Sequence, residues 1–70
     1  MRASRIVDQA TEIMIVGEVA AYLKVSRATI FRMLKRKELP GFKIGSDFRF
    51  RRADIEEWIV KKEQTTFEKR

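Results

Sequence analysis

Cysteine and histidine are both missing from this 70-residue chain, and proline occurs once. Without cysteine no disulfide can reinforce the fold, and without either residue the usual zinc ligands are absent. Catalysis would then depend on serine, aspartate, glutamate or lysine, and no spacing among them pairs a nucleophile with a base. The sequence therefore predicts no enzyme, no cofactor, no metal site and no small-molecule ligand.

Long hydrophobic runs are also missing. The longest, Ile13 to Val16, is far too short to span a bilayer, and residues 1–12 lack the continuous apolar stretch of a secretory signal. We expect a cytoplasmic protein without a membrane partner. A chain of this length forms one small domain, and we predict it over residues 13–62, between loosely packed tails at 1–12 and 63–70.

Positive charge is concentrated in one stretch. Between Lys24 and Arg52 the chain has ten basic and two acidic residues, whereas the rest holds six basic and eight acidic ones. A basic stretch that also folds is typical of proteins that bind polyanions. A solvated surface that is cationic by chance would show the same charge, so the arrangement of the residues must decide.

The spacing of apolar residues predicts two short helices. The first spans about residues 17–24 and buries Val16, Val19, Ala20 and Leu23. Ser26 is a good N-cap for the second, since its hydroxyl can accept a hydrogen bond from an amide of the first turn. The second helix buries Ile30, Met33 and Leu34 and ends by about Glu38, because Pro40 disfavours helical geometry at the preceding residue.

The opposite face of the second helix combines basic, small and aromatic side chains: Arg27, Ala28, Phe31, Arg32 and Lys35. A helix with such a face can enter a major groove, touch base edges and approach phosphates. An ordinary solvated face with one exposed phenylalanine is the alternative.

A hairpin and a third helix follow. Apolar residues alternate with Lys43 and Arg49 on both sides of a turn at Gly45, Ser46 and Asp47; they are Phe42, Ile44, Phe48 and Phe50. We expect these four to face the helices, and the two basic residues to face solvent or a ligand. The third helix begins near Ala53 and buries Ile55, Trp58 and Ile59. The predicted fold class is mainly α with a small β-hairpin.

These pieces, in their order, resemble the excisionase-type helix-turn-helix domain, a minimal relative of the mercury-resistance-regulator type of winged helix. The matching segments are EVAAYL (18–23), VSRATIFR (25–32), LPGFKIG (39–45), FRF (48–50) and DIEEWI (54–59). The resemblance implies a winged helix-turn-helix: helix, turn, recognition helix from Ser26 to about Lys37, two-stranded wing from Phe42 to Phe50, and third helix.

The resemblance also implies which side chains contact DNA. On the recognition helix they are Ser26, Arg27, Thr29, Phe31 and Arg32, and on the wing Lys43, Arg49 and Arg51. The chemistry of the residues themselves adds Ala28, Lys35 and Arg36 on the helix and Ser46 at the turn. Arg27 or Arg32 could pair with guanine and Phe31 could touch a thymine methyl or a sugar, while Lys35, Arg36, Lys43 and Arg49 suit phosphate.

Three positions depart from the family pattern. Ile15 stands where a serine or threonine commonly caps the first helix, and Lys24 stands where glycine is common in the turn. If the usual turn geometry is kept, this lysine needs an unfavourable positive φ. Asp47 stands at the wing tip, where a basic residue is common. Because a carboxylate is repelled by phosphate, Ser46 is the better contact at the tip.

Two biological roles fit a protein that recognises double-stranded DNA. A recombination directionality factor binds adjacent sites and directs a site-specific recombinase, whereas a transcription regulator binds an operator. No heptad pattern predicts a dimerisation helix, so cooperativity would come from the two tails or from a second copy on neighbouring DNA. The alternative is a basic protein-interaction or RNA-binding module of a mobile-element complex.

Overall fold

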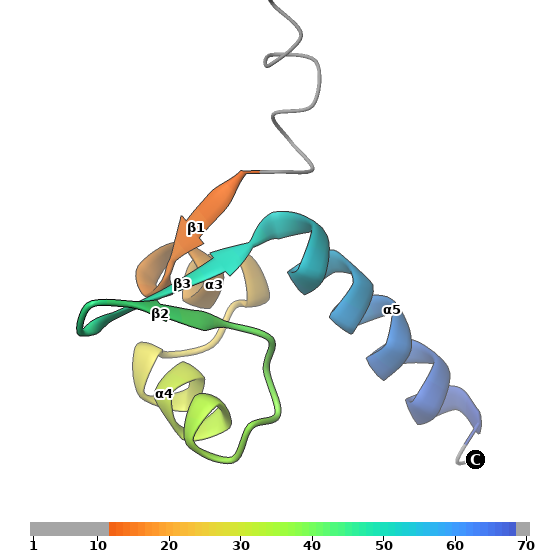
Figure 1. Cartoon of the computed structure of the whole chain (residues 1–70). Coiled ribbons are helices and arrows are strands. Elements are labelled where there is room, and N and C mark those ends of the chain that lie inside the picture. The colour runs from red at the N-terminus through yellow and green to blue at the C-terminus, as the bar shows by residue number, and fades with distance from the viewer. Residues whose placement is uncertain (1–11, 69–70) are drawn as a thin grey trace, which may run out of the picture.

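The structure of the protein is a computed structural model that describes residues 12–68 (Figure 1). The elements follow one another as β1 (Ile13–Ile15), α3 (Val16–Leu23), α4 (Arg27–Lys35), β2 (Phe42–Ile44), β3 (Asp47–Arg51) and α5 (Arg52–Glu68). The predicted combination of helices with a hairpin is confirmed. Except for Glu12, the predicted N-terminal tail lies outside the described residues.

The sheet has three antiparallel strands in the order β1-β3-β2 (Figure 1). β1 was not predicted from the sequence. Its residues pair with the second strand of the hairpin, β3, with Met14 opposite Phe50 and Ile15 opposite Arg49. The apolar run at this point has no alternation of apolar and polar residues, which is the signal that reveals a strand. β1 gives the short hairpin a third strand, and its Met14 side chain enters the core.

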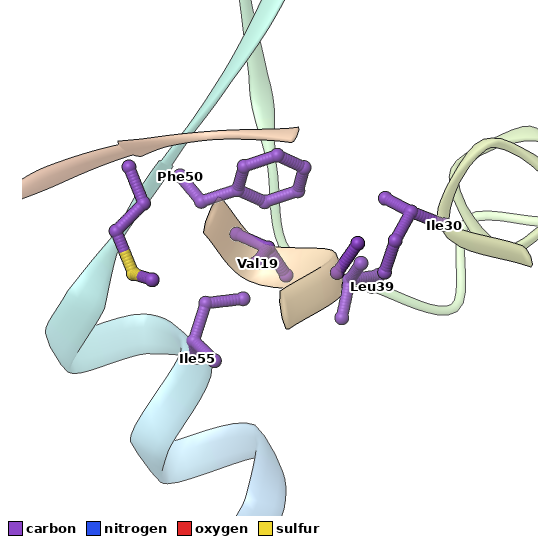
Figure 2. Close-up of a cluster of buried hydrophobic side chains, with 7 residues drawn as sticks. Val19, Ile30, Leu39, Phe50 and Ile55 are labelled. Atoms are coloured by element: carbon purple, nitrogen blue, oxygen red, sulfur yellow. The ribbon is translucent and has the colours of Figure 1, made fainter. Parts of the chain in front are cut away.

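Seven residues from β1, β3, the three helices and the loop before β2 form the core: Met14, Val19, Ala20, Ile30, Leu39, Phe50 and Ile55. In Figure 2 the Phe50 ring lies among side chains from the helices, close to Val19. The helical stripes predicted from sequence supply most of this core. Six other residues that we predicted to be buried are only partly buried and pack against this core: Val16, Leu23, Met33, Leu34, Trp58 and Ile59. The indole nitrogen of Trp58 donates a 2.8 Å hydrogen bond to the carbonyl oxygen of Glu38.

The turn between α3 and α4 has the predicted geometry. Lys24 ends α3 in the left-handed region, with a φ of 61°. Ser26 caps α4, and its hydroxyl accepts a 3.1 Å hydrogen bond from the backbone N–H of Thr29. At the start of α3, Ile15 provides no side-chain cap, and the Glu18 carboxylate instead accepts a 3.0 Å hydrogen bond from the Ile15 N–H.

The predicted orientation of the hairpin side chains is wrong for its first strand. Ile44 pairs with Asp47, so the loop has two residues, Gly45 and Ser46, where three were expected. One residue less in the loop shifts the register by one position and turns the alternate side chains to the other face. Phe42 and Ile44 are therefore 38% and 59% exposed.

The same shift moves Lys43 to the opposite face. It pairs with Phe48, on the side of the sheet that also carries the buried Phe50. Arg49, by contrast, pairs with Phe42 and with Ile15 on the outer face. The two basic residues that we expected on one surface thus lie on different faces of the sheet.

The C-terminal helix is longer than predicted. α5 continues to Glu68, so residues 63–68 are helical where the sequence predicted part of a tail. In Figure 1 this helix leaves the end of β3 and points away from the rest of the fold. Within residues 12–68, no helix is both long and apolar enough to cross a membrane.

Candidate nucleic-acid interface

Three polar side chains, connected by hydrogen bonds, lie along the exposed face of α4. The Ser26 and Thr29 hydroxyls lie 3.0 Å apart, and a guanidinium nitrogen of Arg32 donates a 3.1 Å hydrogen bond to the Thr29 hydroxyl. The three residues are spaced by three positions, which places them one above the other on a helix. The contacts connect the first turn of α4 to Arg32 and restrict where its guanidinium can go.

An open groove lies between the start of α3, the first turns of α4 and the tip of the hairpin. Its volume is about 410 Å³. Four predicted contact residues line it: Arg27, Phe31, Ser46 and Arg49. Residues that sequence analysis did not assign to the site also line it: Ile15, Val16, Gly17, Asp47 and Phe48.

Two aromatic rings join α4 to the hairpin. Phe31 is 49% exposed, yet its ring meets the Phe48 ring edge to face, with centroids 6.4 Å apart. The ammonium group of Lys43 lies 5.5 Å from the centroid of Phe48. Phe31 therefore has a structural contact, and the exposed part of its ring and the Lys43 ammonium lie at the junction of α4 and the hairpin.

Arg49 contacts other residues of its own strand, β3. Its guanidinium donates a 2.9 Å hydrogen bond to the Phe48 carbonyl oxygen and lies 3.9 Å from the Asp47 carboxylate. The pair is solvent-exposed on the Asp47 side and contributes little to stability. Asp47 thus partly neutralises the Arg49 guanidinium.

The remaining predicted contacts are not gathered in the groove. Lys35 and Arg36 are exposed at the C-terminal end of α4, and Ala28 is exposed in its first turn. Arg51 pairs with Ile13 on the outer face of the sheet. A ligand that contacts the groove and these residues together must extend along α4 and around the hairpin.

Arg52, the last residue of the basic stretch, forms ion pairs with two carboxylates. Its guanidinium lies 3.0 Å from Glu56 and 3.5 Å from Glu12, and it sits over the Tyr22 ring at 5.1 Å. The hydrogen bond to Glu56 raises the pKa of Arg52 above its ordinary value, and the nearby Tyr22 and Glu12 contribute to the same shift. Arg52 therefore ties α5 to the residue before β1 and adds little free positive charge.

The model of a family described as "Helix-turn-helix domain" matches residues 14–62. Two curated Mycobacterium tuberculosis proteins, "Putative DNA-binding protein Rv0500A" of strain H37Rv and "Putative DNA-binding protein MT0521" of strain CDC 1551, are each 41% identical to this chain over 39 residues. That alignment covers 56% of this chain and 50% of each relative, so the chain spans about half the length of these relatives. No solved structure matches the chain.

Proposed function

The chain belongs to the helix-turn-helix domain family, as its resemblance to the excisionase-type domain indicates, and we propose that it recognises double-stranded DNA in a sequence-specific manner. The names of the two relatives support DNA binding. The observation that carries the proposal is the surface formed by α4 and the hairpin, where cationic side chains border an open groove.

Electrostatics supports this surface as the binding face. Among residues 12–68, the ion pairs involve Arg49, Arg52 and Lys61, so the basic side chains of α4 and Lys43 carry charge that no described carboxylate neutralises. Each such cation can release a counterion from DNA when it meets a phosphate. Part of the unpaired positive charge thus lies where the recognition helix and the wing would meet the duplex.

Within this proposal the side chains have different tasks. Arg32, which the Thr29 hydroxyl restrains, reads a base edge from the exposed face of α4. Lys35, Arg36 and Lys43 contact phosphates and set the register of the protein on the duplex. Arg49 contributes less, because Asp47 competes for its guanidinium.

Two biological roles fit this proposal, and the arrangement of the binding sites on DNA distinguishes them. A recombination directionality factor would bind several sites in the same orientation beside a recombinase, whereas a transcription regulator would bind an operator, with inverted half-sites if two copies cooperate. In both roles the protein is cytoplasmic, needs no cofactor and acts by binding, not by chemistry.

Changing Thr29 to valine tests the restraint on Arg32. The substitution keeps the shape of the side chain but removes the hydroxyl that accepts the Arg32 hydrogen bond. We expect binding to the preferred duplex to weaken by about 1 kcal/mol, while binding to an unrelated duplex hardly changes. Titration of both duplexes at near-physiological salt measures the two changes.

Thr29→Ser is the matched control, since serine keeps a hydroxyl at this position. It should retain most of the preference for the selected duplex. Equal losses on both duplexes, or a loss as large for the serine variant, would contradict the role assigned to the Thr29 hydroxyl.

A further inference from the structure

Gly17 leaves a space that an arginine from the next helix fills. A Cβ atom at Gly17 would lie 2.7 Å from Nη2 of Arg27 and 3.2 Å from both Cζ and Nε. The first of these distances is shorter than real Cβ contacts, so any side chain at position 17 would compete with the guanidinium. The backbone of Gly17 is helical and its φ is not positive. What matters about this glycine is the space it leaves.

The position of this space ties the first turns of two helices together. Gly17 is the second residue of α3 and Arg27 is the first residue of α4, and both line the groove beside the hairpin tip. Among residues 12–68 no carboxylate forms an ion pair with Arg27. The carboxylate nearest in sequence, Glu18, is engaged with the Ile15 N–H. The Arg27 guanidinium therefore lies over Gly17 without a described ion pair.

That location has a consequence for docking. When a helix-turn-helix binds, the recognition helix enters the major groove by its N-terminal residues, and the preceding helix crosses the backbone. A guanidinium held over the start of α3 lies where these two contacts meet. It is better placed for a phosphate at the groove edge than for a base edge deep inside.

We propose that Gly17 is a positioning residue for DNA binding: the absence of a side chain there leaves the space in which the Arg27 guanidinium lies, where it can contact the DNA backbone. This inference rests on the proposed function and extends it to a residue without any polar group. It also assigns Arg27 to phosphate, which leaves base reading on α4 to Arg32.

The experiment compares Gly17→Ala, Arg27→Ala and the double variant on a duplex selected from a random pool. Alanine favours the helix more than glycine does, and the displaced atoms are the end of a flexible side chain, so the Tm of Gly17→Ala should stay equal or rise. The Kd of each single variant should increase about tenfold, since a charge-assisted contact is lost. The slope of log K against log salt should flatten by about 0.9, as expected for one phosphate contact.

The double variant separates a direct effect from an indirect one. If Gly17 acts through Arg27, adding Gly17→Ala to Arg27→Ala weakens binding no further. Ala21→Ser, an exposed change in the same helix, should leave the Kd and the salt slope unchanged.

Different results would overturn different statements. If Arg27→Ala weakens binding but Gly17→Ala does not, or if Gly17→Ala acts equally without the arginine, the role of Gly17 is wrong and DNA binding stands. If Arg27→Ala binds as well as the unchanged protein, the role of Gly17 is wrong as well. If the unchanged protein binds no duplex DNA, the proposed function fails and the inference fails with it.

Discussion

Changing Phe50 to alanine is expected to lower the free energy of unfolding by about 3–5 kcal/mol. The ring is fully buried and comes from the central strand of the sheet, where it packs among side chains of the helices (Figure 2). Removing it leaves a cavity that neighbouring elements fill only in part. In a domain this small the whole stability is about the same size, so the thermal transition of Phe50→Ala should be nearly lost. Circular dichroism measures the thermal transition during heating and the free energy of unfolding during urea titration.

Two further variants make this prediction decisive. Phe50→Leu keeps most of the volume and should cost less than about 1.5 kcal/mol, which leaves a measurable transition. Phe42→Ala removes the same ring from the neighbouring strand, but Phe42 lies on the outer face and is 38% exposed. Its cost should be about 1 kcal/mol or less. A loss at Phe42 as large as that at Phe50 would contradict the register of the hairpin.

Arg32→Ala is expected to weaken binding to the preferred duplex by about 1–3 kcal/mol and to relax the preference at one base position. The reason is that Arg32 projects from the exposed face of α4 and is held there by the Thr29 hydroxyl. Lys43→Ala should instead weaken binding to all duplexes by similar amounts. The slope of log K against log salt should become shallower by about 1, because one phosphate contact is lost. Fluorescence anisotropy titrations with selected and unrelated duplexes at several salt concentrations separate the two effects.

Lys61→Ala is the control for charge alone. Lys61 lies on α5, where it is 3.9 Å from the Glu57 carboxylate, and its removal lowers the net charge by the same amount. It should leave the preference for the selected duplex intact. If Arg32→Ala and Lys61→Ala behave alike, Arg32 reads no base.

Local signals in the sequence predicted the helices well. Ser26 caps α4 as expected, and Lys24 adopts the positive φ that its place in the turn required. Both features depend on residues within a few positions of each other, which is why they could be predicted from the sequence. α5 extends beyond its predicted end, because its last residues lack the apolar periodicity from which its core-facing part was recognised.

Pairing between distant segments was not predictable in the same way. β1 forms only because its partner strand, more than thirty residues further along, offers an edge. The register of the hairpin depended on whether its loop has two residues or three, and this single residue decided which side chains face the helices. The same distinction applies to the candidate site. Its basic residues could be predicted from the sequence. The space at Gly17 and the neutralisation of Arg52 could not, because they depend on contacts between distant segments.

The central claim is sequence-specific recognition of duplex DNA, and selection of bound sequences from a random duplex pool tests it most directly. The purified protein should be used at near-physiological salt, because low salt rewards charge alone. We expect an enriched motif. Tandem copies of it would support a recombination directionality factor, and inverted copies a regulator. A bound pool without any enriched sequence would contradict the claim, since the basic surface would then bind DNA by charge without reading its bases.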